Sequence, residues 1–204
     1  TARAAAWLAD LVLRGAEARQ NARGRGVLRN IEIAFGGALS PPERQALARR
    51  YTLHLTRLIL EILRLPRLRG GAQAEAQVDF SEIDHLLRDR AQPLIDEDVR
   101  RGGTFVPFCG VQASTHASAA LLQRASGAKI MVVTCQRLGP EQFKVHLWDL
   151  IEPDPSLEVD AERERVCGRI AAGFERALRT YPDQWLWTLR RWKTRPPAES
   201  GQPG

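Results

Sequence analysis

The feature that most constrains this chain is a segment near its C-terminus in which tryptophans alternate with cations. Three tryptophans and four cations fall within the eleven residues from Trp185 to Arg195. Tryptophan is costly to leave in water and arginine is costly to bury, so the segment needs surroundings that suit both. A lipid–water interface is one solution, because the indole body lies in apolar material while its N–H stays hydrated. Docking of Trp185 and Trp187 on the protein core is the other.

The cations of this segment are candidate contacts to an anionic partner, since a guanidinium binds phosphate with a bidentate fork. These candidates are Arg190, Arg191, Lys193 and Arg195. The alternative is that Arg190 and Arg191 only solvate a terminal helix or form surface ion pairs, which contribute little to stability.

The charge of the chain is distributed unevenly. Its 204 residues suffice for one sizeable domain, and 44% hydrophobic with 26% charged residues indicates a globular protein. The net charge of +6 divides into +8 over residues 1–70, −6 over residues 71–160 and +4 over residues 161–204. Basic ends suit an anionic membrane surface, a nucleic acid or an acidic carrier protein.

The three cysteines, Cys109, Cys135 and Cys167, lie far apart in the sequence. No Cys-x-x-Cys or Cys/His ligand spacing is present, so we predict no metal site and no cofactor. An odd number of cysteines without a disulfide framework fits a reducing compartment. No apolar run reaches about eighteen residues, so no transmembrane helix is predicted. The chain begins at Thr1 rather than Met, which leaves room for an N-terminal anchor ahead of it.

Helical spacing of apolar residues predicts an amphipathic helix over residues 3–20 and another over residues 159–180. The second should turn Val166, Ile170, Phe174 and Leu178 inward. A further helix opens with the capping box Ser40-Pro41-Pro42-Glu43, runs to about Arg64 and should end before Pro66. Residues 66–77 form the most flexible stretch, and a short helix begins at Ser81.

The middle of the chain is predicted to be α/β. Thr104 to Cys109 is predicted to be a strand whose Pro107 suits a sheet edge, followed by a turn from Gly110 to Thr115. A helix from Thr115 to Ser126 should end at Gly127, and Lys129 to Cys135 is predicted to be a buried parallel strand. These elements would form one right-handed β-α-β unit. Gln142 to Leu150 is predicted to be a strand with one solvated face.

Four blocks of the sequence resemble the late acyltransferases of lipid A biosynthesis, the lauroyl and myristoyl transferases. The segment Pro182-Asp183-Gln184-Trp185-Leu186-Trp187-Thr188-Leu189-Arg190-Arg191-Trp192-Lys193-Thr194-Arg195-Pro196 is similar to their C-terminal signature, with Leu189 where the family usually has His. The others are Arg29-Asn30-Ile31 with Ala34-Phe35, then Asp96 with Gly103 to Thr115, and then Gly127-Ala128-Lys129. Gly36, Glu97 and Cys109 depart from the family's residues. Arg137 sits where the family often has an arginine.

The resemblance implies a glycerol-3-phosphate-acyltransferase-like α/β fold, with a mixed sheet covered by helices. An N-terminal helical region would span residues 1–66 and the α/β acyltransferase-like domain residues 78–204. It also implies acyl transfer from acyl carrier protein or acyl-CoA to a hydroxyl of a lipid A precursor, in lipopolysaccharide biosynthesis at the cytoplasmic face of the inner membrane. The basic ends suit both the acidic carrier and anionic lipid. Arg137 then joins the four cations of the tail as a head-group-binding candidate.

Acyltransferases of this kind share a His-x-x-x-x-Asp/Glu motif, in which the histidine takes the proton of the acceptor hydroxyl and the carboxylate orients the imidazole. Five residues after the four histidines His54, His85, His116 and His146 stand Ile59, Arg90, Leu121 and Ile151. His85 and Asp89 have the i, i+4 spacing of a surface pair. We therefore assign no catalytic residue, and expect the block to be missing between the regions of Val78–Leu87 and Leu94–Asp98.

Two alternatives to a working enzyme remain. A non-catalytic membrane-binding or lipid-binding homologue fits the missing histidine motif. Nucleic-acid binding is permitted by basic residues among tryptophans. Because no recognition module or zinc-finger spacing is present and the middle of the chain is acidic, we predict no nucleic-acid partner.

Overall fold

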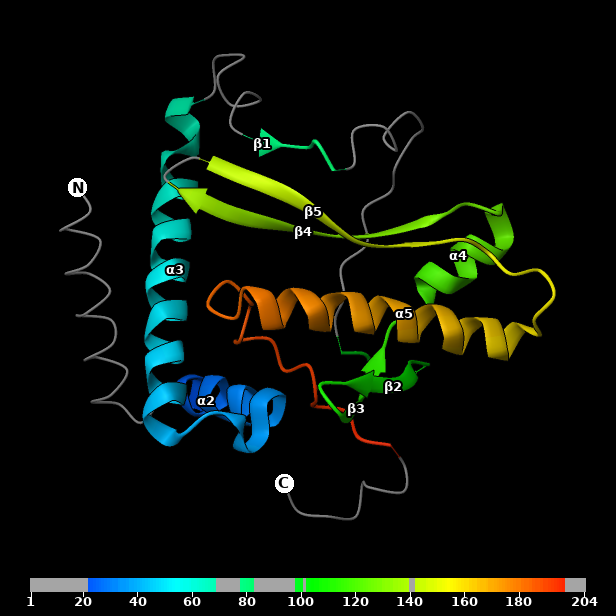
Figure 1. Ribbon diagram of the computed structural model, residues 1–204, viewed down its shortest axis with the longest axis horizontal. Helices are drawn as coiled ribbons and strands as arrows, with labels where there is room; N and C mark the ends of the chain where they lie inside the picture. Colours follow the sequence, from blue (N-terminus) through cyan, green and yellow to red (C-terminus); the bar gives the residue numbers. More distant parts are fainter. Residues whose placement is uncertain (1–21, 69–77, 83–97, 101, 140–141, 197–204) are drawn as a thin grey trace. The chain divides into compact units, whose positions relative to one another are not determined.

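The computed structural model describes residues 22–68, 78–82, 98–100, 102–139 and 142–196 (Figure 1). The chain divides into two compact units, which we treat separately. The first unit is Thr1–Phe80, Cys135–Lys144 and Thr180–Thr188, and the second is Ser81–Thr134, Val145–Arg179 and Leu189–Gly204. The helix predicted over residues 3–20, most of the predicted flexible stretch and the part after Glu82 of the helix predicted from Ser81 lie outside the described residues, while Ser81 and Glu82 form a turn. The division into residues 1–66 and 78–204 stays a prediction.

Helices α2 (Ala22–Phe35) and α3 (Pro41–Leu68), joined by the short 3-10 helix η1 (Gly36–Ala38), form the helical part of the first unit. The predicted start of α3 is confirmed. The amide and hydroxyl of Ser40 donate to the Glu43 carboxylate at 2.7 and 2.6 Å. These bonds lower the pKa of Glu43 and fix the first turn of the helix.

The predicted end of α3 is wrong, because the helix continues through Pro66 to Leu68. A proline removes one backbone donor and crowds the carbonyl four residues earlier, which weakens or bends a helix without always ending it. Pro66 lies within the last turn, where few further helical hydrogen bonds depend on it.

The core of the first unit is formed by α2, α3 and the segment Thr180–Thr188. Ile31, Leu47 and Trp187 are each 1% exposed or less. Asn30 donates its side-chain amide to the Trp187 carbonyl at 2.8 Å, and the Tyr51 and Thr188 hydroxyls lie 3.1 Å apart. Trp187 therefore docks on the protein core, one of the two environments expected from the sequence, whereas Trp185 is half-buried.

The main sheet has the order β1–β5–β4 and is mixed. Strand β1 (Val78–Asp79) pairs parallel to β5 (Gln142–Ile151), with Val78 opposite Phe143. Strands β4 (Ile130–Gly139) and β5 are neighbours that run in opposite directions (Figure 1). The predicted strand at Gln142 is confirmed. The parallel pairing expected for the strand after Lys129 is wrong, because two residues between β4 and β5 permit only an antiparallel hairpin. The described structure is thus mixed α/β.

A second hairpin replaces the predicted β-α-β unit. Strand β2 (Thr104–Phe108) is confirmed, but β3 (Val111–Thr115) occupies the predicted turn and pairs antiparallel with β2. Cys109 and Gly110 have φ angles of 54° and 77°. Two successive left-handed residues form the kind of two-residue turn that closes a hairpin. The turn was missed because cysteine rarely takes a left-handed conformation.

The core of the second unit lies where helices α4 (Ser118–Ser126) and α5 (Val159–Thr180) pack on β4 and β5. Its buried cluster is Ala119, Ala120, Val132, Ile151, Val166 and Ile170, with Ile130, Trp148 and Phe174 packed against it. The inward face predicted for α5 is confirmed. So is the end of α4, where Gly127 has a φ of 70° and donates to the Gln123 carbonyl at 2.7 Å. The helix starts three residues later than predicted, because Thr115 belongs to β3.

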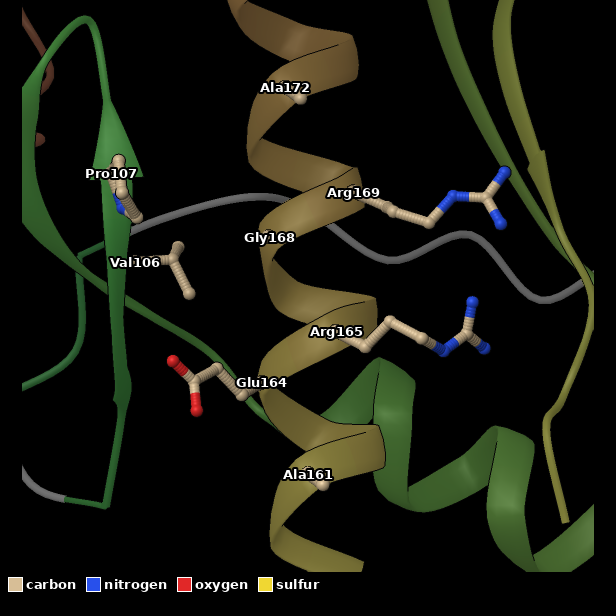
Figure 2. Close-up of a pocket in the computed structure, with 8 residues that line it drawn as sticks. All are labelled: Val106, Pro107, Ala161, Glu164, Arg165, Gly168, Arg169 and Ala172. Atoms are coloured by element: carbon tan, nitrogen blue, oxygen red, sulfur yellow. The ribbon is translucent and has the colours of Figure 1, made fainter. Parts of the chain in front are cut away.

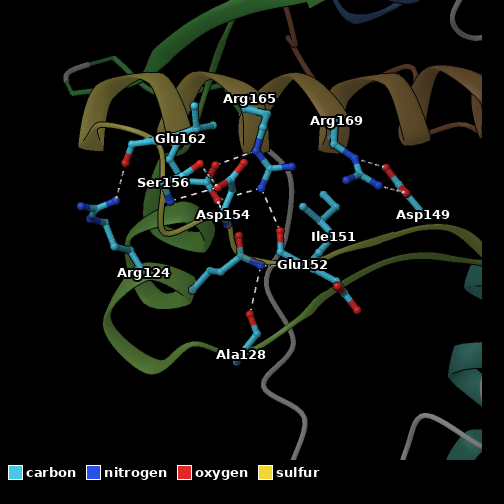
Figure 3. A network of polar contacts seen from close by, with 12 residues as sticks. Arg124, Ala128, Asp149, Ile151, Glu152, Asp154, Ser156, Glu162, Arg165 and Arg169 are labelled. Carbon is cyan, nitrogen blue, oxygen red and sulfur yellow. Dashed lines mark hydrogen bonds and ion pairs between the residues drawn. The ribbon is translucent and has the colours of Figure 1, made fainter.

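Ion pairs attach α5 to the strand and loop beside it (Figure 3). Arg169 binds Asp149 through two bonds of 2.9 and 2.6 Å, and this contact lowers the pKa of Asp149. Arg165 binds Glu162 at 2.6 Å, while Glu162 accepts the Asp154 amide at 3.0 Å. These contacts occupy the charged residues of this face of the helix.

Two glycines of α5 allow a test of this packing. A Cβ at Gly173 would lie 2.8 Å from Val132 Cγ1, whereas a Cβ at Gly168 would meet nothing within 4 Å. We expect Gly173→Ala to destabilise the protein by about 1 kcal/mol, since overpacking of about 1–3 kcal/mol exceeds the helix-propensity gain. The control Gly168→Ala should stabilise it by about 0.5–1 kcal/mol. Urea unfolding measures both, and a stabilising Gly173→Ala would contradict the packing described for β4 and α5.

Candidate functional site

The side chain of Arg191 lies inside the second unit. It is 2% exposed, and its guanidinium donates to the Ser114 carbonyl and the Thr115 hydroxyl, both at 2.7 Å. The guanidinium carbon lies 5.2 Å from the centre of the Phe108 ring, within cation–π range. Arg191 therefore fastens the tail to the β2–β3 hairpin, and a head-group contact by this residue would require the tail to undock.

Two neighbours of Arg191 strengthen the same attachment. Trp192 is 5% exposed and donates its indole N–H to the Phe108 carbonyl at 3.2 Å. Its ring is tilted by 33° to the Phe108 ring, with 5.5 Å between the two ring centres. The amide and hydroxyl of Thr194 donate to the Asp98 carboxylate at 3.2 and 2.9 Å. The structure thus uses Trp192 as a core anchor rather than as a residue at a lipid–water interface.

Two of the three remaining predicted cations of the tail are exposed. Arg190 and Lys193 are exposed and Arg195 is half-buried. A backbone bond of 3.2 Å from Lys193 to the Arg190 carbonyl turns the chain between them. Leu189, beside them, is 40% exposed. We call Leu189, Arg190, Lys193 and Arg195 the tail surface; it combines cations with an apolar side chain, as an anionic lipid surface requires.

Arg137 belongs to the first unit and is held there through its backbone. Gln184 accepts the Arg137 amide at 2.8 Å and donates to the Arg137 carbonyl at 3.1 Å. Its half-buried guanidinium lies near Arg57 of α3, and burial first, then this like charge, lowers the pKa of Arg137. Arg137 thus belongs to the first unit, and the tail surface belongs to the second.

His54 of α3 lies close enough to Arg137 and Arg57 to be influenced by their charges. The sequence analysis did not select it as a site residue. Burial lowers the pKa of His54; nearby Arg137 and Arg57 lower it further, whereas Asp183 acts in the opposite direction. We call His54, Arg57 and Arg137 the cation cluster. The i, i+3 spacing of His54 and Arg57 puts them on one helix face, but no sequence signal connects that face to Arg137.

A groove of about 520 Å³ lies between β2 and α5, lined by Val106, Pro107, Ala161, Glu164, Arg165, Gly168, Arg169 and Ala172 (Figure 2). Glu164 points toward Val106, whereas the guanidiniums of Arg165 and Arg169 point to the other side of α5. Those two side chains bind Glu162 and Asp149. Among the described residues that line the groove there is no histidine, and Glu164 is the one carboxylate.

A histidine and a carboxylate do meet elsewhere in the second unit. His146 Nδ1 lies 3.1 Å from Glu82 Oε1, and Glu82 also accepts the Leu147 amide at 2.9 Å. Neither residue lines the groove of Figure 2. The pair lacks the spacing of the expected motif, and we assign it no reaction.

The thiols of the described residues offer no activated nucleophile. Cys109 and Cys167 are buried, and burial first and then the Glu175 carboxylate raise the pKa of Cys109 to about 12. The pKa of the Cys135 thiol is also raised by loss of hydration, although the residue as a whole is exposed. Within the described ranges, no three His, Cys, Asp or Glu residues gather as metal ligands, and no helix is long and apolar enough to cross a membrane.

Comparison with known proteins agrees with the resemblance noted in the sequence. The family described as bacterial lipid A biosynthesis acyltransferase matches residues 92–194. Two similar proteins are a lipid A biosynthesis palmitoleoyltransferase from Escherichia coli (strain K12) and a lipid A biosynthesis acyltransferase from Shigella flexneri. Each is 30% identical over 108 residues, which cover 52% of this chain and 34% of the relative. The chain thus spans about a third of the length of these relatives.

Replacing two adjacent arginines by alanine, one at a time, tests the attachment of the tail to the β2–β3 hairpin. In Arg191→Ala the buried Ser114 carbonyl and Thr115 hydroxyl lose the hydrogen bonds that the guanidinium donates. We therefore expect the free energy of unfolding to fall by about 1–3 kcal/mol. The exposed neighbour provides the control, since Arg190→Ala should change it by less than about 0.5 kcal/mol. Chemical denaturation of the three proteins measures the difference. Equal stability of the two variants would refute the anchoring role.

The environment of His54 predicts how stability depends on pH. Its pKa in the folded protein is lowered from the ordinary 6.5, so on acidification the unfolded chain takes up the proton first. Stability should therefore be full above about pH 6.5 and fall as the pH drops through the folded pKa. His54→Gln should flatten this part of the profile, as urea unfolding between pH 7.5 and 5 would show. An unchanged profile would mean that folding leaves the titration of His54 unaltered.

Proposed function

Because the chain belongs to the bacterial lipid A biosynthesis acyltransferase family, we propose that it transfers a fatty acyl chain to a hydroxyl of a lipid A precursor. The acyl donor is acyl carrier protein or acyl-CoA. In this reaction the hydroxyl oxygen attacks the thioester carbonyl, the carbon–sulfur bond breaks, and the hydroxyl proton leaves with the thiol. The reaction takes place at the cytoplasmic face of the inner membrane.

The observation that carries the proposal is that the two ends of the matched segment are bonded together in the second unit. Thr194 binds Asp98, Trp192 binds Phe108, and Arg191 binds Ser114 and Thr115. All of these residues lie within residues 92–194. The matched residues therefore include a connected structural element, so the C-terminal segment supports the fold of this chain as well as any contact to substrate.

The tail surface supplies the contact to anionic partners in this proposal. Arg190, Lys193 and Arg195 bind the phosphates of the precursor, the membrane surface or the acidic carrier protein. This assignment is supported by the exposure of Arg190 and Lys193, which contrasts with the burial of Arg191 between them. Arg191 joins them only in a form with an undocked tail, and Arg137 acts separately, in the cation cluster.

A non-catalytic lipid-binding homologue is the second candidate. It is favoured by one sequence observation, namely that none of the four histidines has a carboxylate five residues later. Such a protein would keep the tail surface and its affinity for anionic lipid without transferring an acyl chain.

An acyl-transfer assay separates the two candidates. The purified protein is incubated with acyl carrier protein or coenzyme A carrying a fatty acyl group, together with a lipid A precursor, and the lipid is analysed by mass spectrometry. The expected result is a precursor heavier by one acyl chain. Binding of anionic vesicles without any acylated product would identify the non-catalytic homologue instead.

The tail surface itself is tested by removing charge. Arg190→Gln with Lys193→Gln should weaken binding to anionic vesicles by about tenfold or more, because each cation near such a surface contributes about 1 kcal/mol. A matched control removes two exposed cations elsewhere, by Arg29→Gln with Arg50→Gln. Vesicle co-sedimentation at low and high salt gives the affinities. An equal loss in both double variants would show that only net charge matters.

A further inference from the structure

The groove between β2 and α5 runs along the outer edge of the β2–β3 hairpin (Figure 2). Its lining includes both Val106 and Pro107, and consecutive side chains of a strand point to opposite faces. A groove that reaches both faces of β2 therefore lies at the edge of this strand. The other edge of β2 pairs with β3. All residues that line the groove belong to the second unit.

The pairing with β3 determines which backbone groups of β2 face this outer edge. Because a two-residue turn closes the hairpin, Phe108 and Val111 exchange both of their backbone hydrogen bonds, and every second pair does the same. Val106 is thus turned toward β3, whereas Phe105 and Pro107 are turned outward. Pro107 suits the outward position because it has no N–H to donate. Within the described part of the chain, no contact uses the outward backbone groups of these two residues.

The outer edge of β3 supports this assignment. Ser114 stands directly opposite Phe105, and its carbonyl accepts from Arg191 at 2.7 Å instead of from β2. In an antiparallel ladder, the backbone groups of both residues of such a pair point away from the hairpin. The outer edge of β3 is therefore occupied by the tail, while the corresponding groups of β2 face the groove.

The polar groups at the groove are mostly hydrogen-bond acceptors. Glu164 points toward Val106, and among the described residues its carboxylate has no hydrogen-bonding or ionic partner. Gln112 lies opposite Pro107, on the same face of the hairpin, and its buried Oε1 also lacks a partner there. The outward carbonyls of Phe105 and Pro107 add two more acceptors. The only donor in this set is the Phe105 N–H, so an occupant must bring donors.

The shape of the groove also limits its occupant. The residues that line it on α5 include the small Ala161, Gly168 and Ala172, which leave room along the helix. From Ala161 to Ala172 the helix axis advances by about 16 Å. An extended chain of about five residues has the same length. The volume of about 520 Å³ falls within the range of about 300–1,000 Å³ that is typical of ligand sites.

An extended polypeptide satisfies these groups better than other elongated occupants. An aliphatic chain would cover the edge carbonyls without supplying a donor, and a buried polar group without a partner costs free energy. A helix uses its backbone groups internally and offers few to the edge of a strand. An extended peptide adds as a further strand, with its N–H groups on the carbonyls of the edge. A lysine or arginine in that peptide is attracted by the Glu164 carboxylate.

We propose that this groove binds an extended segment of another polypeptide, which carries a lysine or an arginine and pairs as a strand with the outer edge of β2. The segment accepts from the Phe105 N–H and donates to the carbonyls of Phe105 and Pro107, while its cation binds the Glu164 carboxylate. The site shares no residue with the tail surface. The proposal does not depend on acyl transfer, since peptide binding is measured without any acyl donor.

The first experiment follows backbone amides of the complete chain by NMR while the peptide acetyl-Val-Thr-Lys-Thr-Val-amide is added. The Phe105 amide should show a large shift, because it gains an acceptor when the peptide pairs with it. The amide of Val106 already donates to β3, so it serves as the internal control and should shift much less. A Phe105 amide that the peptide leaves unchanged would overturn the proposal.

The second experiment replaces single N–H groups of the peptide by N-methyl groups. In a paired strand, the N–H groups of alternate residues point to the neighbouring strand. Methylation at these alternate positions should weaken binding by about fivefold or more, whereas methylation at the positions between them should change it by less than about twofold. Fluorescence anisotropy of a labelled peptide gives the affinities. Equal losses at all positions would show that the peptide does not bind as a strand.

The third experiment tests the charge. Glu164→Gln should weaken binding of the lysine peptide by about threefold, as expected for an exposed ion pair. A peptide with glutamate in place of lysine should bind less tightly and should not lose further affinity in this variant. Glu158→Gln removes another exposed carboxylate, just before α5, and should leave the affinity within about twofold. Equal effects of the two substitutions would mean that Glu164 has no specific role.

The last experiment fills the groove. A Cβ at Gly168 would meet nothing within 4 Å, so Gly168→Leu places a larger side chain in the groove without a clash at its Cβ. Peptide affinity should fall by about tenfold or more, because the leucine occupies the space of the added strand. Thermal unfolding followed by circular dichroism verifies the fold, and Ala172→Leu, at an exposed position, replaces this variant if it does not fold. Undiminished binding in the folded variant would refute the site.

Discussion

The second unit depends on a buried guanidinium. A charge removed from water is tolerated only where its donors find partners. Arg191 meets this requirement through the Ser114 carbonyl, the Thr115 hydroxyl and the face of Phe108. Trp192 and Thr194 then complete the attachment of an otherwise irregular segment to the β2–β3 hairpin. A segment that looks like a binding motif in the sequence is therefore in large part a structural one, and its exposed residues, Arg190 and Lys193, are displayed by the anchors between and beside them.

The features of the fold that could be predicted are those determined by neighbours in the sequence. The cap at Ser40, the end of α4 at Gly127 and the inward face of α5 all follow from local residue types. The β2–β3 hairpin could not be predicted in this way, because it turns at Cys109, a residue with no preference for a left-handed conformation. Once that turn is missed, β3 looks like a loop and β4 like the partner of β2. A single unusual φ angle thus changed the predicted topology of the whole middle of the chain.

The candidate sites divide in the same way. Arg190 and Lys193 were predicted as contacts because tryptophans and cations adjoin in one segment, and the structure leaves both side chains exposed. The electrostatic link of His54 and Arg57 to Arg137 could not be predicted, because these residues are about eighty positions apart and belong to different elements of the first unit. A glutamine amide can accept from a backbone N–H and donate to a backbone C=O, as the facing residue of a neighbouring strand does. This role explains why the polar Gln184 stands within an aromatic segment. The sequence alone does not show which backbone Gln184 binds, because its partner Arg137 is brought there by the tertiary structure.

The interleaving of the two units has a consequence for how the protein is made. The chain alternates between the units, and its last described segment supplies Trp187 to the core of the first and Arg191 to the second. During synthesis, neither core can close until these residues have left the ribosome. The usual order, in which an N-terminal domain completes its fold while the rest is being translated, does not match this arrangement of the chain. Until then the apolar residues that Trp187 covers in the first unit and that the Arg191 attachment covers in the second lack part of their packing.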